Sequence, residues 1–285
     1  MLITNVKAYD FEAAIRGMRN PKESWHLSDS KFGIDTIENI ENGQDLKDVV
    51  QAWMEYPERA LEFLGIDLNT KFAKPEYELK KYLLREGILH GDNSTQIYEY
   101  AFIGPADMNL MRSLIKGGSP HCKFMRQIPV SFDLTAPLYW WKEYDTYKVS
   151  TVANSTSQMH KIHTHAIDFD CFETDDFCRD LDVNGIPCYM PIATFLDFLE
   201  QLRLKFLETN DKRYWKELIR WCPQGWLQTR TVSLNFEVIR NMCFYRHSHK
   251  LNEWSGKDHP DLINFINEMK KLPYANALLF SSLEK

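Results

Sequence analysis

The chain has 285 residues, of which 44% are hydrophobic and 26% are charged, and its formal net charge is -6. This length and composition predict a single elaborated domain over residues 1–285 with one sizeable core. No apolar run approaches the ~20 residues that a membrane-spanning helix needs, so we expect no membrane insertion. The mildly acidic balance argues against broad electrostatic binding of nucleic acid.

The first twenty residues lack a basic region followed by a long apolar stretch, so they do not resemble a secretory signal. We therefore expect a cytoplasmic protein. Its six cysteines form no CxxC pair, which is typical of reduced thiols in a large chain. The spacing of His160, His163 and His165 fits no compact zinc site, and we expect no metal.

The first half of the chain predicts a strand at 2–9, a helix at 11–18 and a loop at 20–33. Helices are predicted at 45–53, 58–64 and 76–86. A further helix is predicted at 107–116, with Asp107 as its N-cap and Gly117-Gly118 ending it in a left-handed conformation.

Residues 128–134 are predicted to form a strand, because apolar residues alternate there with polar or small ones. Pro129 cannot donate to a ladder, so this strand either lies at an edge or begins irregularly there. Ala136-Pro137 then suits a helix start, and 138–144 is predicted to be an aromatic-rich helix.

The second half of the chain predicts a loop or a hydrogen-bonding turn at 146–157, an acidic irregular stretch at 169–191, and helices at 195–207 and 212–221. A longer helix is predicted at 231–245 and a last one at 262–269. Many helices around a few strands indicate an α+β (mixed α/β) domain. Cys122 and Cys243 are the candidates for a nucleophile, and the calcium-like run from Asp180 to Gly185 is interpreted as a turn.

Cationic side chains gather in the predicted helix at 231–245 and at its entrance. On one helix, Asn235 and Arg246 are eleven residues apart and would lie within about 20° of the same face. Arg230, at the entrance to that helix, is a candidate phosphate ligand. The alternative is that Arg230, Arg240 and Arg246 form ordinary surface ion pairs with Glu237 or Glu253.

The order of elements from 110 to 156 resembles that of the ThyX family, the flavin-dependent thymidylate synthases. That family has a helix ending in a turn, a strand, an Ala-Pro step, an aromatic-containing helix, and an Arg-His-Arg triplet with a Ser eight residues after its last Arg. Here the triplet reads Thr146-Tyr147-Lys148, and Thr156 stands at the Ser position. Only Lys148 keeps a cation, and Lys is a flexible point charge where Arg is a rigid fork.

The family also has an Asn and an Arg at the separation of Asn235 and Arg246, followed by a Ser-His pair and a Trp. The resemblance therefore implies site residues at seven positions. Arg246 is the implied catalytic residue. The implied nucleotide-binding residues are Arg230, Asn235, Arg246, Lys148 and Thr156, and the implied cofactor-binding residues are Tyr147, Lys148 and Asn241.

The resemblance implies a ThyX-like domain with helices around a small sheet, a long C-terminal helix, and extra sequence near 20–75 and 166–191. It implies reductive methylation of dUMP to dTMP, with methylenetetrahydrofolate as co-substrate and reduced flavin adenine dinucleotide (FAD) passing hydride. It also implies a homotetramer with sites shared between subunits, and Trp140-Trp141 is expected to be part of the interface. Two alternatives stay open: a flavin-free relative that binds or modifies another pyrimidine nucleotide, and an oligomeric structural protein that keeps only the scaffold.

Overall fold

A computed structural model describes residues 1–67, 74–92, 96–177 and 181–281. It shows a mixed helix-and-sheet architecture, which confirms the predicted fold class. Within these ranges no helix combines the length and the apolar character needed to cross a membrane.

The central sheet is antiparallel and has the strand order β1-β5-β9-β6. Its strands are β1 (Leu2–Ala8), β5 (Pro129–Pro137), β9 (Leu227–Asn235) and β6 (Val152–Ser155). A second sheet has the order β2-β4-β3, with β2 (Lys31–Thr36), β4 (Ile97–Phe102) and β3 (Ile88–Asp92). A short hairpin pairs β7 (Asp182–Val183) with β8 (Ile186–Pro187).

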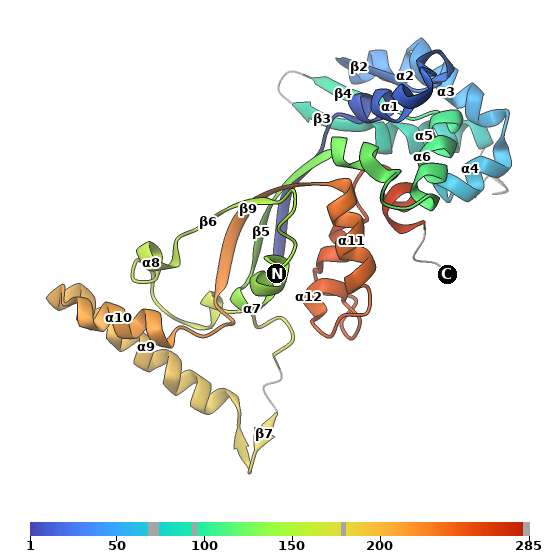
Figure 1. The fold of residues 1–285 in the computed structure, drawn as a ribbon. Coiled ribbons are helices and arrows are strands. Elements are labelled where there is room, and N and C mark those ends of the chain that lie inside the picture. The colour runs from blue at the N-terminus through green and yellow to red at the C-terminus, as the bar shows by residue number, and fades with distance from the viewer. Residues whose placement is uncertain (68–73, 93–95, 178–180, 282–285) are drawn as a thin grey trace.

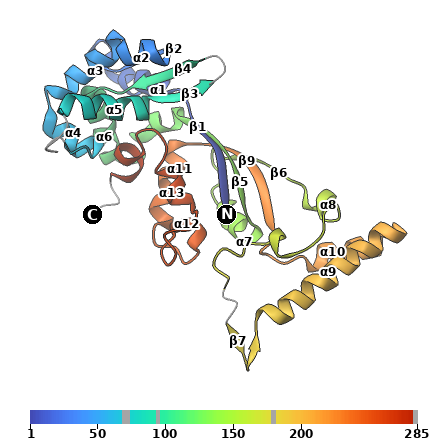
Figure 2. The ribbon, with the colours of Figure 1, turned by 180° about the vertical axis from the view of Figure 1, so that it is seen from behind.

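Helices surround the sheets unevenly. The second sheet and the first six helices gather at one end of the molecule, while α11, α12 and α13 lie alongside the central sheet (Figures 1 and 2). The helices are α1 (Phe11–Arg19), α2 (Ile37–Asn42), α3 (Gln44–Met54), α4 (Pro57–Leu64), α5 (Pro75–Gly87), α6 (Pro105–Lys116), α7 (Leu138–Tyr144), α8 (Gln158–Lys161), α9 (Tyr189–Thr209), α10 (Lys212–Trp221), α11 (Phe236–Arg246), α12 (Asn252–Ser255) and α13 (Phe265–Met269). Short 3-10 segments span Asn20–Lys22, Trp25–Leu27, Cys122–Gln127 and Phe169–Cys171, and a π-helical turn spans Asn276–Phe280.

Two hydrophobic clusters stabilise these elements. The main core includes the inward face of β5, formed by Ile128, Val130, Phe132 and Leu134 as the period-two pattern predicts. A smaller core lies under the hairpin of α9 and α10 and contains Ile162, Ile167, Phe172, Leu196, Leu199 and Leu218. That hairpin projects away from the rest of the chain in both views (Figures 1 and 2).

The strand that begins at Pro129 is central rather than at an edge. β5 pairs with β1 on one side and β9 on the other. Pro129 is tolerated because it is the first residue of the strand, where its carbonyl still accepts a bond from Tyr9 N at 3.0 Å. Of the two alternatives that Pro129 left open, the edge position is therefore wrong.

The helix predicted at 231–245 is the largest error of the sequence analysis. Residues up to Asn235 belong to strand β9, and α11 contains only Phe236–Arg246. The C-terminal helix is consequently short, and α9 with 21 residues is longer. The loop predicted at 146–157 is also partly wrong, because Val152–Ser155 forms the edge strand β6 on β9.

Asp107 is not the N-cap of α6. That position belongs to Gly104, and Asp107 is fully buried in the first turn. Its carboxylate accepts from Arg19 Nε at 2.6 Å and from the hydroxyls of Ser28 and Ser30, both at 2.6 Å. Gly118, at φ +87, ends the helix in the predicted left-handed conformation.

Trp140 and Trp141 are buried, with 0% and 1% of their surface exposed, so they form no surface patch. The predicted interface at Trp140-Trp141 rested on an exposed aromatic patch, and that expectation is wrong. At the calcium-like run, Asp180 lies outside the described residues. Asp182 accepts from Gly185 N at 2.9 Å in the β7–β8 turn, which agrees with the turn interpretation.

Candidate functional site

The candidate site forms around the C-terminal end of α7, where the aromatic helix meets the triplet at 146–148. Helix α7 begins directly after Pro137, because proline with its extended backbone ends the strand and leads into a first helical turn. Its last residues carry two carboxylates, on Glu143 and on Asp145 at the C-cap. Each carboxylate pairs with one of the predicted arginines.

Arg246 reaches this end of α7 from the last turn of α11. Its Nη1 lies 2.5 Å from Glu143 Oε2, and its Nε donates to Tyr147 Oη at 3.2 Å. The guanidinium also lies over the ring of Trp254 at 5.3 Å. His249 Nε2 lies 3.1 Å from the same Glu143 oxygen, and burial lowers the pKa of His249. Arg246 and Tyr147, two of the implied site residues, therefore lie in contact.

Arg230 reaches α7 from strand β9. It shares the inward face of the sheet with Val232, since side chains alternate along a strand. Its guanidinium stacks over Trp141 at 4.1 Å, and its Nη1 lies 2.7 Å from Asp145 Oδ1. The Nε donates to Gln228 Oε1 at 3.0 Å.

The two arginines hold α7 from different sides. Glu143 and Asp145 are two residues apart, which places them about 200° apart around a helix axis. The alternative of ordinary ion pairs is thus correct in kind, although the partners differ from those expected. Glu237 instead pairs with Arg126, and Glu253 accepts from the hydroxyl of Tyr139.

Both arginine side chains are more buried than the carboxylates with which they pair. The exposed side-chain fractions are 19% for Arg246 and 15% for Arg230, against 34% for Glu143 and 50% for Asp145. In the described part of the chain, Nη2 of neither arginine makes a hydrogen bond. Within the described ranges, each guanidinium group therefore keeps one nitrogen without a hydrogen bond, beside a carboxylate that is more exposed than the arginine.

A column of stacked aromatic rings begins at Trp254, beneath Arg246, and continues into α7. Trp254 stacks on Trp140 at 4.4 Å, and Trp140 stacks on Tyr144 at 5.4 Å. Among the described residues, Trp254 Nε1, Trp140 Nε1 and Tyr144 Oη are buried without a hydrogen-bond partner. Unpaired buried polar atoms are uncommon, and they gather here beside the candidate site.

Asn235 does not join this site. It is the N-cap of α11, and its buried side chain accepts from Val238 N at 3.1 Å. Eleven residues of helix, at 1.5 Å each, separate it from Arg246 by about 16 Å along the axis. Asn241 lies half-buried in the middle of α11.

The triplet at 146–148 is mostly engaged within the chain. Thr146 Oγ1 donates to the carbonyl of Glu143 at 2.7 Å, so it closes the end of α7. Tyr147 Oη accepts from Arg246. Lys148 is exposed. These three residues do not fit the flavin contacts implied by an Arg-His-Arg triplet, because two of them are occupied and neither of the two carries a charge.

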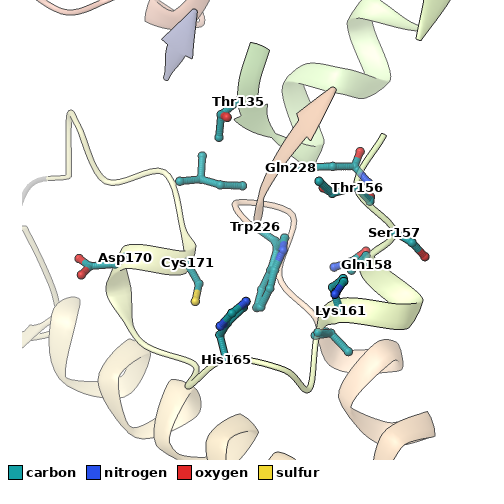
Figure 3. Close-up of a pocket in the computed structure, with 12 residues that line it drawn as sticks. Thr135, Thr156, Ser157, Gln158, Lys161, His165, Asp170, Cys171, Trp226 and Gln228 are labelled. Atoms are coloured by element: carbon teal, nitrogen blue, oxygen red, sulfur yellow. Dashed lines mark hydrogen bonds between the residues drawn. The ribbon is translucent and has the colours of Figure 1, made fainter. Parts of the chain in front are cut away.

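Thr156 lines a separate cavity of about 470 Å³ at the open end of the central sheet (Figure 3). Arg246 does not line it. Its wall combines the ends of β5, β6 and β9 with α8 and the 3-10 segment that follows. The lining residues are Thr135, Thr156, Ser157, Gln158, Lys161, Ile162, His165, Asp170, Cys171, Trp226, Leu227 and Gln228.

The described ranges contain no group of three or more His, Cys, Asp or Glu side chains arranged to hold a metal ion, and Cys178 lies outside them. Burial raises the pKa of Cys122, and burial also raises that of Cys243 beyond the normal range of a thiol. Neither thiol has the lowered pKa that favours a nucleophile.

Sequence reasoning missed the carboxylates of Glu143 and Asp145 and the cavity residues Trp226 and Lys161. The sequence did offer a signal for Glu143 and Asp145, because two acidic residues at the end of an aromatic helix need cationic partners, and Arg230 and Arg246 were already candidates. No local signal identifies the cavity, because its wall comes from segments that are far apart in the sequence.

No family model matches the chain, and no curated protein matches it. Solved structures do show similarity. The chain is 17% identical to the ThyX of Helicobacter pylori complexed with FAD and dUMP, with a TM-score of 0.42, covering 62% of this chain and 83% of that one. A second ThyX structure from the same organism, with FAD and dUMP, gives 13% identity, a TM-score of 0.49 and full coverage of both chains. The UMP/dUMP methylase PolB of Streptomyces cacaoi, bound with 5-Br UMP, gives 12% identity and a TM-score of 0.38, covering 49% and 64%. The two ThyX structures are of the family that the order of elements in this sequence resembles.

Proposed function

We propose that this protein binds a pyrimidine nucleotide, using Arg230 and Arg246 as its anion-binding residues. The observation that supports the proposal best is the setting of the two guanidinium groups. Each is stacked on aromatic rings, each is mostly buried, and each is paired with a carboxylate that is more exposed than the arginine. A phosphate would replace a carboxylate with a more highly charged acceptor at no cost in reorganising the arginine.

The reaction that the resemblance implies is methylation of the pyrimidine base. The similar solved structures are described as ThyX with FAD and dUMP and as a UMP/dUMP methylase. FAD would supply hydride in such a reaction. Because Thr146 and Tyr147 do not fit the flavin contacts of the family, we derive no step through that cofactor or through methylenetetrahydrofolate.

A flavin-free protein that binds or modifies another pyrimidine nucleotide is the candidate that the triplet favours. In the triplet, the hydroxyls of Thr146 and Tyr147 already have hydrogen-bond partners inside the chain, and Lys148 alone contributes a cation. An absorbance spectrum of the purified protein distinguishes the two candidates. Bands of bound flavin would support the flavin-dependent reaction, and their absence after incubation with FAD would support the flavin-free one.

We further propose a homo-oligomer, of which a tetramer is the form that the resemblance implies. The two arginines lie on different sides of α7, so sites shared between copies would allow both to contact one nucleotide. The projecting hairpin also leaves apolar side chains exposed for such contacts, among them Phe198 at 50% and Leu207 at 53%.

Calorimetric titration of dUMP into variants tests the nucleotide proposal. Arg246→Ala and Arg230→Ala should each weaken binding by on the order of 2 kcal/mol, because each removes a charge-assisted bond to phosphate. Arg220→Ala is the matched control, since Arg220 forms an exposed ion pair on α10 away from the site. If the wild type binds no dUMP, or if both site variants bind as tightly as the control, the proposal is wrong.

A further inference from the structure

The cavity beside β9 is connected to Arg230 through a single side chain. Gln228 lines the cavity, and its Oε1 accepts from Arg230 Nε at 3.0 Å. Its Nε2 donates to the carbonyl of Thr156, also at 3.0 Å. Gln228 is thereby held between the cavity and the arginine. A mononucleotide has a similar layout, with its base and its phosphate separated by one sugar.

Trp226 provides an aromatic surface within this cavity. It lies at the centre of the lining residues in Figure 3, with His165 and Cys171 on one side and Gln158 on the other. Its orientation is fixed from behind, because its ring packs edge-to-face on Phe172 with the centroids 5.4 Å apart. A half-buried indole that is already immobilised can stack against a flat heterocycle with little loss of side-chain entropy.

Polar side chains of both charges surround this aromatic surface without pairing with one another. In the part of the chain that the structure describes, the side chains of Lys161, His165 and Asp170 make no hydrogen bond or ion pair. Lys161 and Asp170 carry opposite charges, so the lining is close to neutral. This balance suits an uncharged ring that offers both hydrogen-bond donors and acceptors better than it suits a phosphate.

We propose that the cavity receives the base of the pyrimidine nucleotide, stacked on Trp226, while the phosphate lies against Arg230. The inference rests on the proposed function, and it adds which part of the ligand each region holds. Lys161, His165 and Asp170 contact the edge of the base and select it. The volume of about 470 Å³ is within the range of cavities that hold small molecules.

The test compares dUMP with 2-deoxyribose 5-phosphate, which has the sugar and phosphate but no base. The wild type should bind dUMP at least tenfold more tightly. Trp226→Leu should remove most of that difference and leave the affinity for deoxyribose phosphate unchanged. Arg230→Ala should instead weaken both ligands. Trp221→Leu is the matched control, because Trp221 is 54% exposed on α10 and does not line the cavity.

Trp226→Leu could misfold, since Trp226 also packs on Phe172, so a second variant tests the cavity independently. Lys161→Ala with His165→Ala removes two exposed side chains that lack internal partners, so folding should be unaffected, and binding of dUMP should fall severalfold with deoxyribose phosphate unchanged. If the wild type binds no dUMP, the proposed function itself fails. If it binds dUMP through Arg230 while the cavity variants keep full affinity, the function stands and this inference is overturned.

Discussion

The buried hydroxyl of Tyr144 allows a prediction about stability that depends on one atom. Tyr144 is 2% exposed, and its Oη has no hydrogen-bond partner among the described residues. Burial also raises the pKa of this phenol beyond its ordinary range, so it remains uncharged at neutral pH. Tyr144→Phe removes the oxygen and leaves the ring in its stack with Trp140.

The expected gain follows from the cost of an unpaired polar group. A buried donor without a partner costs roughly 1–3 kcal/mol, and the small space left by the oxygen offsets part of the gain. Tyr144→Phe should therefore raise the free energy of unfolding by about 1 kcal/mol. The same substitution at Tyr274 should have the opposite sign, because that fully buried Oη donates to Ala101 O at 2.7 Å and accepts from Ile103 N at 3.1 Å. Tyr274→Phe should cost about 2 kcal/mol.

Urea unfolding followed by circular dichroism measures both changes, and the shift of the midpoint at constant slope gives the difference in free energy. Thermal unfolding should agree, with a midpoint about 2 °C higher for Tyr144→Phe. A loss of stability in Tyr144→Phe similar to that in Tyr274→Phe would show that the Tyr144 hydroxyl does have a partner in solution. The reasoning from its unpaired state would then be refuted.

Three further predictions concern other parts of the molecule. Asp107→Asn should lower the free energy of unfolding by about 3–5 kcal/mol in urea, since it leaves the buried Arg19 without its counter-charge; an unchanged midpoint would contradict this. Burial raises the pKa of Glu253 above 4.5, so the folded state binds that proton more tightly, and wild-type stability should fall relative to Glu253→Gln as pH rises above 4.5. A parallel pH dependence of the two proteins would rule this out. Light scattering should show that the protein is an oligomer. If its sites are shared between subunits, mixing the Arg230→Ala protein with the Arg246→Ala protein should restore part of the dUMP binding. A monomer would contradict both predictions.

Strand β9 shows how far local sequence pattern can mislead. Residues 231–245 contain apolar residues at helical spacing, and the helix was predicted across all of them. The β-branched Thr231 and Val232, followed by alternating Ser233 and Leu234, are equally consistent with a strand. Asn235 marks the true boundary, because it is a preferred N-cap residue with an apolar run behind it.

Other elements were predictable to different degrees. The strand at 128–134 and the helix after Pro137 were identified because periodicity and proline both indicate them. Strand β6 was missed, since its four exposed residues carry no apolar alternation and are ordered by pairing with β9. At the candidate site, Arg246 and Tyr147, both named from the family resemblance, lie in contact, and their role in binding stays a prediction. The separation of Asn235 from them could not be predicted, because it depends on where α11 begins.

Strand β9 runs into helix α11 without a loop, so an inserted residue in either element would change the direction of an arginine side chain. One inserted residue between Arg230 and Asn235 would turn Arg230 to the opposite face of the sheet, away from Trp141, because side chains alternate along a strand. One residue inserted within α11 would rotate Arg246 by about 100° and carry it away from Glu143. Related chains that keep this site should therefore tolerate changes of length in the loops on either side of these two elements, but none in the seventeen positions from Arg230 to Arg246.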